Sequence, residues 1–281
     1  MLRVSVLLVA IAIGWVTVSA VNQRRTVELL KRDSLGWVEL VHGNREPLIR
    51  RVAAGGRIPG SGWIGRLLLR RERRALEALA GAAAGGLAVP RLVTDPEVAA
   101  LAGPEGQRLA PRAVLVRSYQ AGLALHQATQ LPRDFFDLVD ALVMAMHRAG
   151  VCHNDLHKEQ NLVVGEDGRP ALIDFQLASI HRRGGRAFRV RCAEDLRHVQ
   201  KHRRRYTRDG RGPVEAGVQH GAGLGRKRGP LAWAWRRMAK PLYNGLTRKI
   251  LRTKDGEERR LSSGPWPRWV DPVGDNPLGS E

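Results

Sequence analysis

Residues 152–176 read CHNDLHKEQNLVVGEDGRPALIDFQ, and this stretch carries the clearest indications of fold and function. Two short apolar runs, LVV and ALID, have the character of strands, and the GEDGRP run between them permits a turn. Asp155 and Asn161 precede the first run, and Asp174 ends the second. A hairpin of this kind brings two carboxylates and an amide together. Such oxygen donors are the ligands that a hard cation prefers.

The same stretch resembles the catalytic loop and metal-binding segment of the protein-kinase-like superfamily. HNDL, beginning at His153, stands where that superfamily has H-R-D-L, and DFQ, beginning at Asp174, stands where it has D-F-G. Gln176 replaces the glycine and removes a backbone hinge. The resemblance implies an α+β, two-lobed protein-kinase-like fold, with a small antiparallel-sheet N-lobe and a mainly helical C-lobe. It also implies ATP and Mg²⁺ as cofactors.

The resemblance assigns a role to each polar residue of the stretch. Asp155 is expected to accept the proton of the substrate hydroxyl, with His153 supporting the loop, while Asn161 and Asp174 hold Mg²⁺ on the ATP phosphates. Five residues separate Asp155 from Asn161 where the family has four, so Gln160 stands at the nominal position of the amide ligand. Asn161 and Gln160 are both metal-ligand candidates. Asn161 is favoured because the strand follows it directly.

The residues before this stretch supply the parts of an N-lobe. The runs WVELV and PLIRRV flank an HGN turn and predict a hairpin. Gly36 alone stands for the family's glycine-rich loop. Arg50 or Arg51 stands in place of the strand lysine that binds phosphate in the family. The alternation of side chains along a strand favours Arg51 as the inward residue. The alternative for either arginine is a solvated strand end. Residues 62–80 follow a helical period, and Glu72 falls inside the apolar stripe of this helix. A buried carboxylate needs a cation, so we expect an ion pair of Glu72 with Arg51 or Arg50. The alternative is that Glu72 joins its arginine neighbours on the surface.

A hinge and a helix are predicted on the C-lobe side of the N-lobe. Residues 118–122 are expected to form the hinge, and residues 132–150 a helix with proline at its first position and glycine at its end. Asp195 either supports the catalytic loop or is an acid in the first turn of a helix beginning near Glu194. The compact ending resembles small atypical bacterial kinases, namely the lipopolysaccharide-core Kdo/heptose kinases and the RIO-type serine/threonine kinases.

Charge and cysteine content narrow the partners and the compartment. A net charge of +20 over 281 residues indicates an anionic partner: a membrane surface, a phosphorylated glycan or nucleic acid. Cys152 and Cys192 are too few and too irregularly spaced to predict a disulfide framework or a zinc site, and they fit a reducing compartment. His153 and His157 flank Asp155 and raise a zinc or iron hydrolase as an alternative. The kinase-like order of the motifs disfavours it.

Five segments are predicted along the chain. Residues 1–25 contain an uncharged run long enough to span a bilayer, followed by arginines, so we expect a cytoplasmic protein associated with the inner membrane. A signal peptide and an incidental extension are the alternatives. Residues 26–117 form the N-lobe and 118–206 the C-lobe. Residues 207–229 are a flexible Gly/Arg linker, and 230–281 are a basic amphipathic extension.

The expected function is an ATP- and Mg²⁺-dependent kinase that transfers the γ-phosphate to a hydroxyl of a protein Ser/Thr or of a lipopolysaccharide-core sugar. Two other functions remain open. A kinase-fold pseudoenzyme acting as a regulator is indicated by the reduced glycine loop and the absent strand lysine. A basic RNA-binding protein related to the RIO kinases is indicated by the positive charge.

Overall fold

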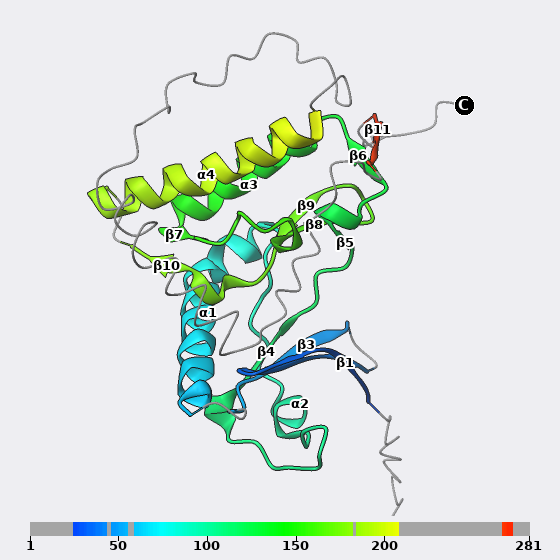
Figure 1. Ribbon diagram of the computed structural model, residues 1–281, viewed down its shortest axis with the longest axis vertical. Helices are drawn as coiled ribbons and strands as arrows, with labels where there is room; N and C mark the ends of the chain where they lie inside the picture. The colour runs from blue at the N-terminus through cyan, green and yellow to red at the C-terminus, as the bar shows by residue number, and fades with distance from the viewer. Residues whose placement is uncertain (1–24, 44–45, 56–58, 182–183, 208–265, 272–281) are drawn as a thin grey trace, which may run out of the picture.

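The computed structural model describes residues 25–43, 46–55, 59–181, 184–207 and 266–271. Over these residues the fold is mixed α/β, with a four-stranded antiparallel sheet, three smaller sheets and four α-helices. Figure 1 shows the four-stranded sheet at one end of the molecule and two long helices, α3 (Phe135–Arg148) and α4 (Arg186–Thr207), side by side at the other. Helix α1 (Ser61–Ala84) runs from the sheet toward this helical end.

The four-stranded sheet follows the strand order β1-β2-β3-β4. Its strands are Thr26–Asp33, Gly36–His42, Leu48–Val52 and Val114–Ser118. The predicted hairpin is therefore present as β2 and β3, in a register that pairs Val38 with Arg51 and Glu39 with Arg50. Because side chains alternate across a strand, Arg50 and Arg51 point to opposite faces of the sheet.

Arg50 is buried on the sheet face next to the short helix α2 (Pro96–Ala100). Its guanidinium lies 2.7 Å from Glu39 and donates to the carbonyl oxygens of Leu101 and Ala102. Trp37 donates its indole N–H to the same glutamate at 2.9 Å. Arg50 is completely buried, so this pair is part of the packing of the sheet. The expectation that Arg50 could bind phosphate is wrong, because the side chain is enclosed on the far face.

Helix α1 covers the other face of the sheet. Leu69 packs there with Ala53 of the segment after β3 and with Leu115 of β4. The helix extends past the predicted end at residue 80, because the alanines that follow favour helix. It ends where Gly86 adopts a φ of +94°, a conformation that glycine accepts without strain.

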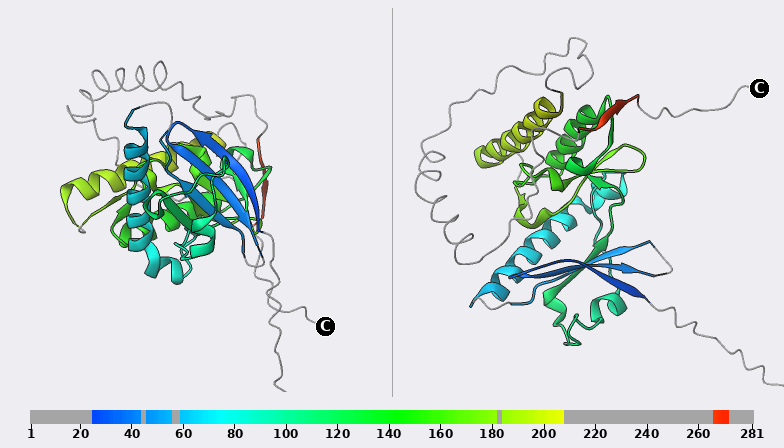
Figure 2. Two further views of the ribbon diagram at one scale, coloured as in Figure 1. Left: turned by 90° about the horizontal axis from the view of Figure 1, so that it is seen from below. Right: turned by 45° about the vertical axis from the view of Figure 1, so that its right-hand side comes forward.

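The remaining elements form the helical end of the molecule, seen from two further directions in Figure 2. The chain reaches it through residues 119–122, where a hinge is predicted. The predicted hairpin is present as β8 (Leu162–Val164) and β9 (Pro170–Leu172), with β5 (Leu123–Ala124) on the other side of β8. A second small sheet joins β7 (Val151–Cys152) to β10 (Ser179–Ile180). Single 3-10 turns lie at Leu125–Gln127, Glu159–Asn161 and Phe175–Leu177 of this end, and another lies at Pro111–Ala113, directly before β4 of the four-stranded sheet.

Two local predictions at this end are corrected. Pro132 belongs to strand β6 (Gln130–Pro132), and helix α3 begins at Phe135. The strand exists because β11 (Arg268–Val270) pairs with it in parallel, so part of the extension predicted over residues 230–281 is a strand. Trp266 and Trp269 from the same tail pack against the core. Pairing between residues so distant in sequence leaves no local pattern.

Helix α4 also differs from its prediction, since it begins at Arg186 and not near Glu194. Asp195 therefore lies in the middle of the helix and is completely buried. An ordinary first-turn acid is excluded, because such a residue lies at the exposed start of a helix. The alternative, a residue that supports the catalytic loop, agrees with the contacts described below.

The expectation of membrane association is also corrected. In the part of the chain that the structure describes, no helix is long and apolar enough to cross a membrane. The uncharged N-terminal run that motivated this expectation lies outside the described residues. So do most of the predicted linker 207–229 and of the extension 230–281.

Breaking the Glu39–Arg50 pair is expected to destabilise the sheet. The Arg50→Met variant leaves a buried carboxylate without its cation, which should lower the free energy of unfolding by about 3–5 kcal/mol in urea denaturation. Arg91→Met, at an exposed arginine of the same part of the molecule, serves as the control and should change stability by less than about 0.5 kcal/mol. Similar losses in both variants would contradict a structural role for Arg50.

Candidate catalytic site

The loop between β7 and β8 is hydrogen-bonded to the carboxylate of Asp195 on α4. One carboxylate oxygen accepts the backbone N–H of His153 at 2.8 Å, and the other accepts that of Asn154 at 2.9 Å. Asn154 has a φ of 64°, in the left-handed region that non-glycine residues seldom adopt. The two hydrogen bonds to Asp195 hold the backbone in this conformation. Helix α4 thus fixes the start of the loop.

His153 joins the loop to the segment that carries Asp174. Its Nε2 lies 2.9 Å from the carbonyl oxygen of Ile173, and its Nδ1 accepts the backbone N–H of Asp155 at 3.3 Å. The imidazole ring also packs on Phe175, with 4.8 Å between ring centroids. Since His153 is completely buried, it acts as a support between two polar segments and has no access to a substrate.

Asp155 is an enclosed carboxylate with a basic side chain next to each oxygen. Its Oδ1 lies 3.0 Å from Nδ1 of His157, and its Oδ2 lies 3.1 Å from Nζ of Lys158. Burial opposes ionisation of this group, but His157 and Lys158 together hold the pKa of the Asp155 carboxyl below its usual range. Asp155 is therefore ionised at neutral pH and able to accept a proton or a hydrogen bond. Lys158 was not expected at the site, although its spacing from Asp155 could have indicated it.

Asn161 is the amide that lies against Asp155. Its side-chain N–H donates to the backbone carbonyl of Asp155 at 2.9 Å and to Oδ2 at 3.1 Å. The backbone carbonyl of Asn161 accepts the backbone N–H of Ile173 at 3.1 Å, which joins the loop to the hairpin. Asn161 is the last residue of the 3-10 turn Glu159–Asn161. Gln160 lies in the same turn and is partly buried.

Asp174 follows strand β9 and is held at a φ of 65°. It and Asn154 are the two non-glycine residues with positive φ in the described part of the chain. Its Oδ1 lies 3.1 Å from Nη1 of Arg51. Burial opposes ionisation, but Arg51 and then His153 hold the pKa of the Asp174 carboxyl below its usual range, against the repulsion of Asp155. The strained, partly exposed carboxylate is thus directed between the sheet and the catalytic loop.

Three charged residues continue from Asp174 into the sheet and α1. Arg51 also contacts Glu72 at 3.3 Å, and Glu72 contacts Nε of Arg117 at 3.2 Å. Glu72 is completely buried, so it lies inside the apolar stripe of α1 and not on the surface. Of the two arginines considered as its partner, the structure pairs it with Arg51. Arg117 was not expected, because a basic residue at a strand end has no distinctive pattern.

Gly36 lies where β2 passes close to β3. A side chain there is excluded, since a Cβ atom would be 1.8 Å from the carbonyl oxygen of Val52. Gly36, Arg51 and Gln176 line a small cavity of ≈ 30 Å³ between the sheet and α1. The cavity could hold a few water molecules at most, and nucleotide pockets are about ten times larger or more.

Helix α4 also holds the loop through a second set of contacts, which the sequence analysis does not predict. His202 Nε2 lies 2.8 Å from the carbonyl oxygen of Leu156, within the loop. Glu159 accepts a hydrogen bond of 2.7 Å from the hydroxyl of Tyr206 and lies 2.5 Å from Arg205. The four-residue spacing from His202 to Tyr206 was a usable signal, because it places both on one helix face.

The oxygen donors of this site suit Mg²⁺. Asp174 is ionised and partly exposed, and Asn161 uses its N–H group on Asp155, which directs its carbonyl oxygen away from that residue. Carboxylate and amide oxygens are what Mg²⁺ binds in proteins, together with water and phosphate. Arg51 now neutralises Asp174 and would have to share that carboxylate with the ion. The residues therefore fit a hard cation.

His198 on α4 is expected to make stability depend on pH. Burial lowers its pKa, and the neighbouring Arg197 lowers it further, to about 4. An unfolded histidine titrates near about 6.5, so between these values only the unfolded chain binds the proton. Stability is fully present above about pH 6.5 and is lost as pH falls toward the folded pKa.

Removing this histidine tests that linkage. His198→Gln should reduce the slope of unfolding free energy against pH, between about pH 5 and 6, by up to about 1.4 kcal/mol per pH unit. Urea denaturation at several pH values measures the slope. Lys201→Gln removes an exposed charge from the same helix and should leave the slope unchanged. An unaltered slope in His198→Gln would show that the histidine stays protonated in the folded protein.

The sequence-predicted residues that meet at this site are Asp155, His153, Asn161, Asp174, Arg51 and Glu72, with Gly36 beside them and Arg50 apart. No protein-family model matches the chain, and no curated protein matches it in a sequence search. The resemblance to the protein-kinase-like superfamily therefore stays a prediction from the sequence motifs.

Proposed function

We propose that the protein is an ATP- and Mg²⁺-dependent phosphotransferase with a two-lobed, protein-kinase-like fold. The observation that carries the proposal is the meeting of Asp155, Asn161 and Asp174 with the Arg51–Glu72 pair. These residues come from a loop, a hairpin end, a strand and a helix that are distant in sequence. Protein kinases use this set for phosphoryl transfer: a base, metal ligands, and a cation fixed by a carboxylate.

The arrangement of the elements is consistent with two lobes. The antiparallel sheet with α1 represents the N-lobe, and the helices α3 and α4 with the hairpin β8–β9 represent the C-lobe. Residues 119–122 are the connection between them. In this interpretation α1 is the helix whose glutamate fixes the strand cation, and Arg51 takes the position of the strand lysine.

Asp155 is proposed to orient the acceptor hydroxyl and to accept its proton. Its low pKa keeps it ionised, and the hydrogen bond from Asn161 fixes its carboxylate plane. The ammonium of Lys158, beside the same carboxylate, is positioned to attract the phosphoryl group as it moves toward the acceptor. Asp174 and Asn161 would hold Mg²⁺, which neutralises phosphate charge and aligns the transferred group.

Arg51 is proposed to bind the ATP phosphates. Glu72 holds its guanidinium from one side, and Arg117 balances the second oxygen of that glutamate. The cavity beside Arg51 measures only ≈ 30 Å³, so binding of ATP there would require the surrounding side chains to move. Arg51 would then exchange a carboxylate for phosphate oxygens, which its planar guanidinium also matches.

The acceptor is proposed to be a hydroxyl of a protein Ser/Thr or of a lipopolysaccharide-core sugar. The positive charge of the chain suits a phosphorylated, anionic acceptor. Labelled phosphate transferred from ATP into fractionated cell material, separated into protein and glycolipid, distinguishes the two acceptors. Nucleotide binding without transfer into any fraction would favour a regulator with a kinase-like fold.

The Asp155→Asn variant tests the proposed base. It removes the proton acceptor while keeping the shape of the side chain, so phosphotransfer from labelled ATP should fall by about 10²–10⁴-fold. Asp167→Asn, at an exposed carboxylate in the turn between β8 and β9, is the matched control and should keep the wild-type rate. Wild-type transfer by Asp155→Asn would overturn the assignment.

The Arg51→Ala variant tests the proposed phosphate contact. Loss of a charged hydrogen-bonding partner should weaken binding of Mg²⁺-ATP by about 10–100-fold, measured by calorimetry. Arg51→Lys retains the charge and should recover part of the affinity. Arg70→Ala, at an exposed arginine of α1, should bind as the wild type does. Equal affinity in Arg51→Ala and the wild type would exclude Arg51 from the phosphate site.

A further inference from the structure

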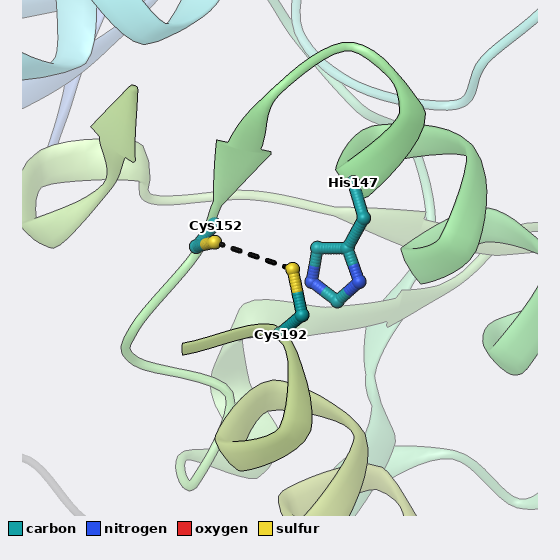
Figure 3. Close-up of side chains that lie close together, drawn as sticks. All are labelled: His147, Cys152 and Cys192. Atoms are coloured by element: carbon teal, nitrogen blue, oxygen red, sulfur yellow. Dashed lines mark hydrogen bonds between the residues drawn. The ribbon is translucent and has the colours of Figure 1, made fainter. Parts of the chain in front are cut away.

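Two cysteines and a histidine gather behind the start of the catalytic loop. Cys152 ends strand β7 and is completely buried, Cys192 lies in α4, and His147 lies in the last turn of α3. The two sulfur atoms are 3.7 Å apart, and one ligand atom from each of the three residues lies within 4.8 Å of the others. Figure 3 shows the imidazole ring and both thiols turned toward one another.

The spacing of the sulfur atoms matches a shared metal ion better than a disulfide. Two sulfurs bound about 2.3 Å from a tetrahedral zinc ion lie about 3.8 Å apart. The sulfurs of a disulfide are separated by about 2.05 Å, so the two thiols would have to move closer to form that bond. The observed 3.7 Å needs no such approach. The backbone already holds the two thiols at the separation that a zinc ion would require.

The chemistry of the donors selects the class of metal. Thiol and imidazole groups bind borderline-soft ions such as Zn²⁺ and are poor ligands for Mg²⁺ or Ca²⁺. Binding of one Zn²⁺ releases the two thiol protons, and two thiolates with a neutral imidazole then balance the charge of the ion. Cys192 is partly exposed, so water can reach the fourth position.

We propose that Cys152, Cys192 and His147 bind one zinc ion, which joins β7, α3 and α4 behind the catalytic loop. The loop begins with the residue after Cys152, and Asp195, one turn after Cys192 on α4, accepts two of its backbone N–H groups. Asp195 also lies 3.1 Å from His147, so the metal site and the loop support share neighbours. Zinc binding here does not depend on phosphotransfer.

Cobalt and zinc titrations of the full reduced chain test the site. Co²⁺ should bind with one equivalent and produce a thiolate-to-metal charge-transfer band, which Zn²⁺ removes. The chain has two cysteines in total, so such a band can arise only from Cys152 and Cys192. Cys192→Ser, at the less buried cysteine, should abolish the band and weaken zinc binding by at least about 100-fold. His42→Gln, at an exposed histidine of β2, should leave both unchanged.

A second measurement uses the wild-type protein alone. Zinc should slow alkylation of the cysteines by iodoacetamide, and a chelator should restore the rate. The proposal is overturned by a cobalt complex without a thiolate band, by unchanged zinc affinity in Cys192→Ser, or by alkylation that zinc does not slow. It is equally overturned if the thiols form a disulfide at the same rate with and without zinc, because bound thiolates are protected from oxidation.

Discussion

The candidate site depends on one chain of ion pairs, from Asp174 through Arg51 and Glu72 to Arg117. It joins a hairpin end, a strand, a helix and a second strand. Two of the four side chains are almost fully enclosed, and their charges are tolerated because each has an opposite charge within 3.3 Å. Losing one member leaves another charge buried and unpaired, which is costly. These ion pairs therefore join the four-stranded sheet and α1 to the segment that follows β9.

A second constraint acts from the opposite side, through helix α4. Asp195 and His202 bind backbone groups of the loop, and Tyr206 with Arg205 fixes Glu159 within it. These contacts stabilise the loop although Asn154 has a strained backbone. The loop conformation that they stabilise places Asn161 next to Asp155. The geometry of the site thus depends on α4, which contacts the loop, and on the ion pairs of Arg51, which contact Asp174.

The local sequence pattern predicted much of the fold and several residues of the candidate site. The alternation around Arg50 and Arg51 indicated the strand and the inward residue, and the apolar stripe around Glu72 indicated a buried carboxylate. The long helix α1 and the hairpin β8–β9 lie within a few residues of their predicted positions. The pattern failed at Pro132 and at the start of α4. At Pro132, pairing with a strand from the tail outweighed the local signal, and α4 begins at Arg186, well ahead of Asp195, its first buried residue.

By itself, the sequence determined the order of the motifs, the polar residues of the loop and the charge of the chain, because these depend on residues close together. Only the tertiary structure decided that Arg51 and not Arg50 reaches Glu72, and that Asn161 lies on Asp155. It also brought Cys152 and Cys192 to 3.7 Å, although their spacing in the sequence argued against a shared site. Side chains from different elements come together only when tertiary packing places those elements next to each other. The distance between two such side chains cannot be predicted from the residues around each of them.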